Sequence, residues 1–383
     1  AMHPSGSGRV NREFGLAFHS DSGFLRGMLS VTTPSTRANV EGVVFCVQSG
    51  DDTGNNPHNP TYWITKAGLN GSLTALAGTS SSMSGGNAAS PASSINPAAR
   101  PVPLARPADA RSLATLGQLN ALFSNAKVDR IMATIENLSS SHLAAFQDKD
   151  LPSQIREVLG CSFSKARTTA AEGGDRLDPL LDPAVTAVFP NIAANGEDQK
   201  VATIAKLVLD NVAGGGTIQK GGYDYHTGDR AAGEQKDLEA GIAVGQCLEL
   251  AARKGKDLLL YVFTDGGVSS NGVIDASVNG RGKGVWTGDS GERSAAFLLF
   301  YRAGTARPSI RLPGRQIGYF RDSGQAVDSA SSIIARDVEK LSMAVLLNYL
   351  ALDGNEGNLG NIVGGVNPFA GAMDKYIFFN KVG

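Results

Sequence analysis

Carboxylate and imidazole side chains follow three predicted strands of this chain. Asp51 and Asp52 come after the first strand, Asp224 and His226 after the second, and Asp265 after the third. Oxygen and nitrogen ligands at the carboxyl edge of a parallel sheet can hold Zn²⁺ or a harder ion such as Mg²⁺ or Ca²⁺. Because Asp224 and His226 are two residues apart, an extended backbone would point both side chains toward one metal ion.

Each of these residues also has an interpretation without a metal. Asp51 and Asp52 lie in a run of Gly, Asp, Thr and Asn that supplies turns, and Asp265 stands before two glycines, as in a β-turn. Asp224 and His226 precede a predicted helix, where they could belong to a capping segment with a hydrogen-bonded loop histidine. Both interpretations stay open on the sequence alone.

Basic residues gather around a predicted loop over residues 277–294. Arg281, Lys283 and Arg293 belong to this group. Guanidinium groups bind phosphate and sulfate through paired N–H donors, so Arg281 and Arg293 are the candidates for steadying an anionic ester during catalysis. A solvated basic loop is the alternative interpretation.

The elements that would position these groups alternate between strand and helix. Short apolar, β-branched runs predict strands over 42–48, 217–223 and 258–263, and an amphipathic helix over 234–254 joins the last two. A helix of that length permits a right-handed crossover between parallel strands. The expected fold class is therefore α/β, with a mostly parallel sheet flanked by helices. Further patterns predict strands over 295–301 and 316–320 and helices over 110–127, 133–146, 151–159, 199–212 and 331–352.

Length and composition favour one large domain. The chain has 383 residues, of which 42% are hydrophobic, so we expect a single α/β domain over residues 1–383. Residues 79–110 consist mostly of Ser, Gly, Ala, Asn and Pro and predict a long surface excursion. Residues 111–195 predict a mainly helical insertion.

Charge and motifs exclude several protein classes. The 35 Lys and Arg residues balance 36 Asp and Glu residues, which argues against nucleic acid as a partner. No apolar run is long enough for a transmembrane segment, and Cys46 and Cys247 lie in apolar runs typical of core thiols. The sequence contains no P-loop, no HExxH pair, no GxSxG elbow and no GxGxxG motif after a strand.

The segments around the second and third predicted strands form a longer pattern. Lys220–His226, the amphipathic helix and Leu259–Gly267 follow the order Gly-aromatic-Asp-X-His, helix, strand, carboxylate-Gly. In this the chain resembles the DUF1501 family, which is similar to the alkaline phosphatase and sulfatase superfamily. The resemblance extends over roughly residues 40–70 and 200–350. Its other matching segments are Val43–Gly54, Asn56-Pro57-His58 with Tyr62-Trp63, and Ser294–Gly304.

The resemblance implies an alkaline-phosphatase-like fold with two metal ions. Such ions activate a Ser or Thr nucleophile, or a water, against a phosphate or sulfate ester. By position it implies Asp224, His226, Asp265 and one of Asp51 or Asp52 as metal ligands. It also implies an exported or periplasmic bacterial protein, and the opening Ala1-Met2-His3 is consistent with a signal peptide removed ahead of it.

Two histidines of the family's ligand set are absent from this chain. Asp265-Gly266-Gly267 stands where the superfamily has Asp-His-Gly, and Thr287–Gly291 stands where the family has Thr-Asp-His-Gly. Of the five histidines, His58 is the main remaining candidate ligand beside His226. We therefore expect one divalent ion (Zn²⁺, Mg²⁺ or Ca²⁺) or none. Two hypotheses follow: a metal-dependent hydrolase of small phosphate or sulfate esters, or a non-catalytic exported binding or envelope-associated protein on the same fold.

Overall fold

The chain divides into two compact units. Unit 1 joins Ala1–Pro103 to Ile204–Gly383, and unit 2 is Leu104–Thr203. All residues discussed below for function belong to unit 1. The computed structural model describes residues 10–50, 56–113, 125–145, 174–223, 230–264, 266–278, 281–290, 294–304, 306–323 and 325–382.

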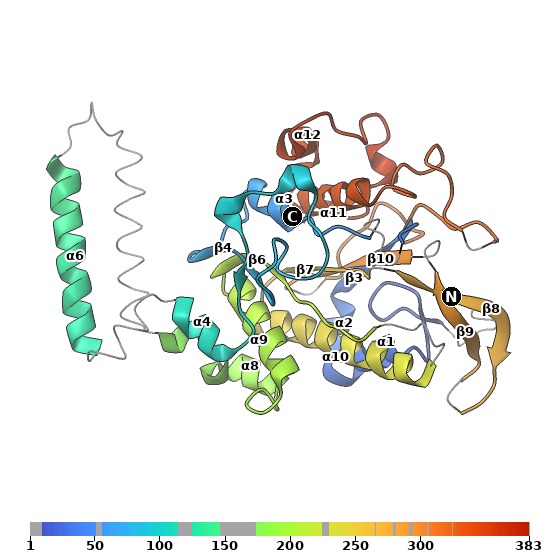
Figure 1. Ribbon diagram of the computed structural model, residues 1–383, viewed down its shortest axis with the longest axis horizontal. Coiled ribbons are helices and arrows are strands. Elements are labelled where there is room, and N and C mark those ends of the chain that lie inside the picture. The colour runs from blue at the N-terminus through green and yellow to red at the C-terminus, as the bar shows by residue number, and fades with distance from the viewer. Residues whose placement is uncertain are drawn as a thin grey trace. The chain divides into compact units, whose positions relative to one another are not determined.

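A four-stranded sheet in the order β11, β3, β10, β7 forms the centre of unit 1 (Figure 1). Strand β10 runs antiparallel to both of its neighbours, with Leu298 opposite Val43 on one side and Tyr261 on the other. Strand β11 runs parallel to β3. The predicted strands over 42–48, 258–263 and 295–301 are confirmed with slightly different ends. The strands are β3 (Val40–Val47), β7 (Leu258–Val262), β10 (Ser294–Tyr301) and β11 (Gln316–Ile317).

The expectation of a mostly parallel sheet is wrong. Strand β10 lies between β3 and β7 and runs in the opposite direction to both. An apolar run does not encode strand direction, because a strand buried on both faces has the same composition in either kind of sheet. The fold is mixed α/β with several sheets, one of which is parallel throughout.

That parallel sheet has the order β5, β4, β6 and consists of β4 (Thr74–Gly78), β5 (Val102–Pro103) and β6 (Ala213–Thr217). The predicted strand over 217–223 is therefore misplaced, because the glycines expected to end a helix form the strand itself. A Cβ on Gly214 would lie 2.4 Å from the carbonyl oxygen of Leu69, and one on Gly216 would lie 2.4 Å from a methyl carbon of Ile204. Close packing thus explains these glycines.

The expected parallel crossover does not occur either. Strands β6 and β7 belong to different sheets, so the helix between them does not join two strands of one sheet. That helix, α10 (Arg230–Lys254), begins four residues before its predicted start and lies on one side of the main sheet together with α1 (Gly23–Val31) (Figure 1).

Glycines let α1 and α10 approach until their backbones touch. A Cβ on Gly241 of α10 would lie 1.9 Å from the carbonyl oxygen of Phe24, and one on Gly27 of α1 would lie 2.2 Å from that of Leu238. Four-residue spacing places Gly23 and Gly27, and likewise Gly241 and Gly245, on one face of each helix. This contact brings the N-terminal ends of the two helices together.

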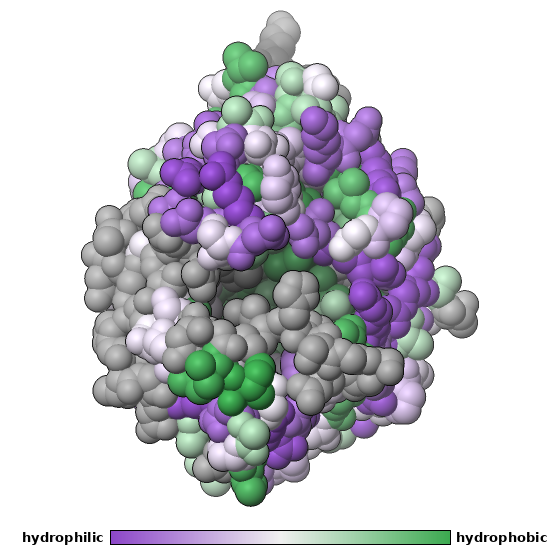
Figure 2. Space-filling view, turned by 90° about the vertical axis from the view of Figure 1, so that its right-hand side faces the viewer, coloured by the Kyte–Doolittle hydropathy of each residue, from purple (hydrophilic) through white to green (hydrophobic). Residues whose placement is uncertain are grey.

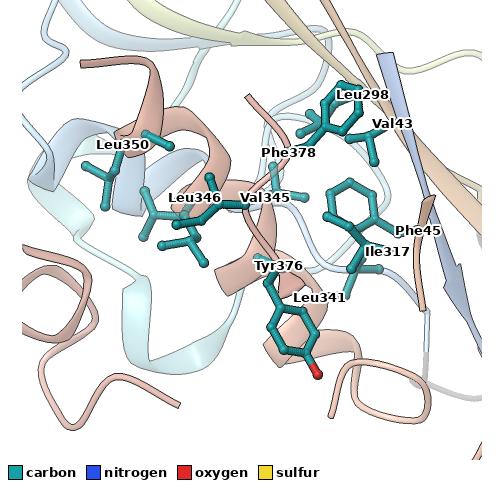
Figure 3. Close-up of a cluster of buried hydrophobic side chains, with 14 of the residues drawn as sticks. Val43, Phe45, Leu298, Ile317, Leu341, Val345, Leu346, Leu350, Tyr376 and Phe378 are labelled. Atoms are coloured by element: carbon teal, nitrogen blue, oxygen red, sulfur yellow. The ribbon is translucent and has the colours of Figure 1, made fainter. Parts of the chain in front are cut away.

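Helix α11 (Val338–Asp353) covers the other side of the main sheet. Figure 3 shows its Leu341, Val345 and Leu346 in the same cluster as Phe45 of β3 and Leu298 of β10. The predicted helix over 331–352 starts too early, because the Asp337 side chain accepts the Lys340 N–H and caps α11 at that point. The remaining helices and strands of unit 1 are short: β1 (Val10–Asn11), β2 (Phe18–His19), α2 (Pro34–Ala38), α3 (Thr61–Lys66), η1 (Ala92–Ser94), η2 (Pro97–Ala99), η5 (Glu356–Asn358), α12 (Leu359–Val363) and η6 (Met373–Lys375).

An antiparallel hairpin precedes β10. It consists of β8 (Gly267–Asp275) and β9 (Lys283–Ser290), with irregular register between Ser269 and Ile274. Figure 1 shows it at the edge of unit 1, beyond the N-terminal end of α10.

The part of the Ser- and Gly-rich tract that belongs to unit 1, residues 79–103, is folded. Ser84, Ser90 and Ser94 are buried, and the Tyr62 hydroxyl donates to the carbonyl oxygen of Met83 at 2.6 Å. The hydroxyl groups of Ser82 and Ser84 both donate to the carbonyl oxygen of Gly86. These bonds satisfy Ser82 and Ser84 within their own loop, whereas the buried Ser90 hydroxyl has no hydrogen-bond partner among the described residues.

The described part of unit 2 is helical. An ion pair between Arg111 and the buried Asp178 ties two of its segments together. Helix α9 contains the boundary between the two units. The described helices of this region are α4 (Pro107–Leu113), α6 (Asn125–Ala145), η3 (Gly174–Leu177), η4 (Pro179–Leu181), α8 (Pro183–Val188) and α9 (Gly196–Leu209). Across the described residues of the whole chain, no helix combines the length and the apolar character needed to cross a membrane.

Candidate functional site

Two of the predicted site residues lie in the described part of the chain, Arg281 and His58. The other predicted ligands and the second predicted arginine lie outside the described residues: Asp51, Asp52, Asp224, His226, Asp265 and Arg293. Arg281 and its neighbours form the candidate site in the described residues.

Arg281 lies in the turn of the β8–β9 hairpin with a left-handed backbone, at φ +53°. Its N–H donates to the carbonyl oxygen of Ser277 at 2.9 Å, and the following Gly282 also has a positive φ. A left-handed conformation is costly for a residue with a side chain, so the turn would form more easily with glycine or asparagine. The guanidinium pairs with Asp21, and this contact lowers the pKa of the Asp21 carboxyl.

Six charged side chains meet around this contact, and we call them the basic cluster. They come from the N-terminal end of α1, the N-terminal end of α10 and the hairpin. Its members are the cations Arg26, Arg230, Arg281 and Lys283 and the carboxylates Asp21 and Glu234.

Glu234 is the centre of the basic cluster. Its carboxylate pairs with Lys283 and lies 3.7 Å from Arg26 and 3.6 Å from Arg230. It also accepts the backbone N–H of Gly23 at 3.1 Å, at the first residue of α1. One carboxylate thus joins both helix ends to the return strand of the hairpin.

Arg230 is the most buried cation of the cluster, with a side chain only 8% exposed. Its Nη1 donates to the carbonyl oxygen of Gly284 at 2.6 Å, and its Cζ lies 5.7 Å from the centre of the Trp286 ring. Its Nε and Nη2 are buried without a hydrogen-bond partner, as is Nε of Arg26. Buried donors without partners are costly, so these atoms have unused capacity to bind an acceptor.

Burial is the main influence on the pKa of Lys283. It lowers the pKa of the ammonium group by more than the Glu234 and Asp21 carboxylates raise it, and the charge of Arg230 lowers it slightly further. Burial disfavours the charged form of a lysine, so the partner Glu234 is needed to hold this cation in place.

The basic cluster can bind an oxyanion. Four cations share the carboxylates of Asp21 and Glu234, and Asp275 interacts with Arg230 from a greater distance, so among the described residues one positive charge is not balanced. The N-terminal ends of α1 and α10 add partial positive charge at the same place. Planar guanidinium donors suit the oxygens of phosphate and sulfate.

His58 lies elsewhere in unit 1, beside the start of α11. Its carbonyl oxygen accepts the Ser342 hydroxyl at 3.0 Å, and its Nδ1 is buried without a hydrogen-bond partner. Burial lowers the pKa of the imidazole, while Glu339 and Asp337 raise it less. A neutral imidazole is the form that binds metal ions. Within the described residues, however, no three His, Cys, Asp or Glu side chains gather to hold an ion.

Sequence reasoning found Arg281 and Lys283 but missed Arg230, Glu234 and Asp21. The i,i+4 spacing of Arg230 and Glu234 at the start of an amphipathic helix was the available signal. Nothing in the sequence links this pair to Asp21, which is more than two hundred residues away along the chain.

Comparison with known proteins gives no relative for this chain. No family model, no curated protein and no solved structure matches it.

Proposed function

We propose that this protein binds a small phosphate or sulfate ester at the basic cluster and hydrolyses it with the help of a divalent metal ion. The observation that carries the proposal is the buried Arg230 side chain, whose Nε and Nη2 have no hydrogen-bond partner within a group of excess cations. Two ester oxygens would accept these N–H groups, and Arg281, together with Arg293, would steady the developing charge.

The order of residues along the chain supports the metal part of the proposal. His226 and Asp224 come four and six residues before Arg230, the first residue of α10, and Asp265 comes two residues before β8. With one of Asp51 or Asp52, and with His58 as a further candidate, they form a donor set of carboxylates and imidazole that suits Zn²⁺, Mg²⁺ or Ca²⁺. Such an ion would lower the pKa of an attacking water or hydroxyl and offset negative charge on the ester.

A second function has support of its own. Both histidine ligands that the resemblance to the DUF1501 family calls for are missing: Gly266 stands at one position, and the Thr287–Gly291 segment contains no histidine. A protein with an intact oxyanion site and a lost metal site would bind the ester without turning it over. This alternative is a non-catalytic binding protein, exported or periplasmic as the resemblance implies.

Metal analysis and turnover separate the two functions. We expect protein purified without chelator to hold a divalent ion that Asp224→Ala loses, and to hydrolyse p-nitrophenyl phosphate or p-nitrophenyl sulfate. Sulfate binding without metal or turnover would support the non-catalytic function.

Sulfate titration tests the basic cluster itself. Arg281→Gln should weaken sulfate binding about three- to tenfold, because it removes one charge-assisted contact. Arg321→Gln is the matched control, because Arg321 is similarly exposed and pairs with Asp328 away from the cluster. Equal sulfate affinity in both variants would contradict the proposed site.

A further inference from the structure

The end of the β8–β9 hairpin exposes three aliphatic side chains, which we call its tip. Val273 and Ile274 at the end of β8 are 57% and 45% exposed, and Val278 in the turn is 89% exposed. Elsewhere in the described part of unit 1, exposed large apolar residues occur singly along the chain, as Val366 does. A group of three within six residues is unusual for a surface in contact with water alone.

Figure 2 views the side of unit 1 that carries the hairpin. It shows hydrophobic residues gathered in a patch on this face, with hydrophilic residues beside them. The apolar tip and the basic cluster belong to the same hairpin: Val278 is three residues before Arg281 and five before Lys283. An apolar tip above a cationic base is the arrangement found in proteins that bind the interface of a membrane.

The return strand of the hairpin is held firmly to the body of unit 1. Lys283 donates to the carbonyl oxygen of Asp21 at 2.9 Å and pairs with Glu234, and Gly284 accepts the Nη1 of Arg230. The body of unit 1 therefore holds the hairpin in place below its tip. Asp275 is the acidic residue at the tip, and its carboxylate accepts the Ser277 N–H within the turn.

We infer that this hairpin docks the protein on the surface of a bilayer that contains anionic lipid. The tip residues Val278 and Ile274 would enter the boundary between headgroups and acyl chains, while Arg281 and Arg26 face the phosphates. A protein partner is less well matched, because protein interfaces centre on aromatic or Arg anchors, whereas the exposed apolar residues of this tip are all aliphatic. The inference goes beyond the proposed function and does not require hydrolysis.

Co-sedimentation with lipid vesicles tests the inference. We expect the full chain to bind vesicles of equimolar phosphatidylcholine and phosphatidylglycerol. Binding to phosphatidylcholine alone should be at least tenfold weaker, because Arg281 and Arg26 then lose their attraction to anionic headgroups. Added salt should release the protein from the mixed vesicles, because it screens that attraction. Changing Val278→Ser together with Ile274→Ser should reduce binding about tenfold, because both residues lose their apolar contact with the bilayer.

The controls keep this test apart from the proposed function. Val366→Ser alters a valine that is 87% exposed but lies outside the hairpin, and should leave vesicle binding unchanged. The hairpin variant should keep the sulfate affinity of the unmodified protein, which also shows that it is folded. Equal binding to both kinds of vesicle, no binding, or binding that the hairpin variant retains would overturn the inference. So would a self-associated state that the hairpin variant abolishes, because the tip would then be an interface between copies of the chain.

Discussion

Arg315 and Arg281 share an uncommon backbone and a similar partner but occupy opposite environments. Both have a left-handed φ, +54° and +53°, and both pair with a carboxylate. The partner of Arg315 is Glu41, whose side chain is 2% exposed and whose two oxygens accept Nε at 2.9 Å and Nη2 at 3.1 Å. Arg281 instead pairs at the surface with Asp21, inside a group that contains more cations than carboxylates.

We call the Arg315–Glu41 contact the closed pair, because its hydrogen bonds are complete, and the Arg281–Asp21 contact the open pair, because it belongs to a group with unused donors. Glu41 has both oxygens occupied, and Arg307 lies 3.9 Å from one of them as a second cation. In the basic cluster the buried Arg230 keeps two nitrogens without hydrogen-bond partners, Nε and Nη2. A buried ion pair whose hydrogen bonds are complete holds the fold together, whereas one with unused donors can bind an additional anion.

Breaking the closed pair should have the largest effect. Arg315→Met leaves the Glu41 carboxylate buried without its bidentate partner, and should lower the free energy of unfolding by about 3 kcal/mol. Urea denaturation followed by circular dichroism measures this. Arg281→Met, the matched change at the open pair, should leave the urea midpoint nearly unchanged. Equal losses in the two variants would remove the distinction.

The glycine contact between α1 and α10 comes next. Gly241→Ala places a Cβ against the carbonyl oxygen of Phe24, so the helices must separate at a cost of about 2 kcal/mol. Because this contact sets the distance between Arg26 and Glu234, sulfate affinity should fall as well. Gly314→Ala, at a glycine with no neighbour within 4 Å and no positive φ, controls for the added methyl group. Unchanged sulfate affinity in Gly241→Ala would show that the contact does not position the cluster.

Arg230 of the basic cluster should affect binding more than stability. Arg230→Met removes two donors without hydrogen-bond partners together with the Nη1 bond to the carbonyl oxygen of Gly284. The free energy of unfolding should therefore fall by less than in Arg315→Met, while the dissociation constant for sulfate should rise about tenfold or more. Isothermal titration calorimetry and urea denaturation on the same samples give both quantities. A large loss of stability with unchanged sulfate affinity would place Arg230 with the closed pair.

The smallest expected effect is at His58, a half-buried histidine whose Nδ1 is buried without a hydrogen-bond partner. Burial lowers its pKa below the ordinary 6.5, so the unfolded chain binds a proton at higher pH than the folded one. Stability should therefore fall as the pH drops from about 7 to 5, and His58→Gln should remove that part of the slope. Thermal unfolding across this range is the measurement, and an identical slope in the variant would contradict the assignment.

Much of unit 1 was predictable from local pattern. The strand β3, the strand β7 and the helix α10 follow the apolar runs over 42–48 and 258–263 and the amphipathic period over 234–254, because burial of a regular face selects the period. The strand β6 was not predictable in this way, because its glycines are required by close contacts with residues that are distant in sequence. The basic cluster was found only in part, at Arg281 and Lys283.

The sequence by itself determined the type of most helices and strands of unit 1 and the position of Arg281 on a loop. Periodicity and composition are local properties, and local sterics and burial translate them directly into helix or strand. Only the tertiary structure decided the direction of β10, the joining of α1 to α10 and the balance of charge around Arg230. These depend on which distant segments come into contact, and the charge of a site is a sum over all of them.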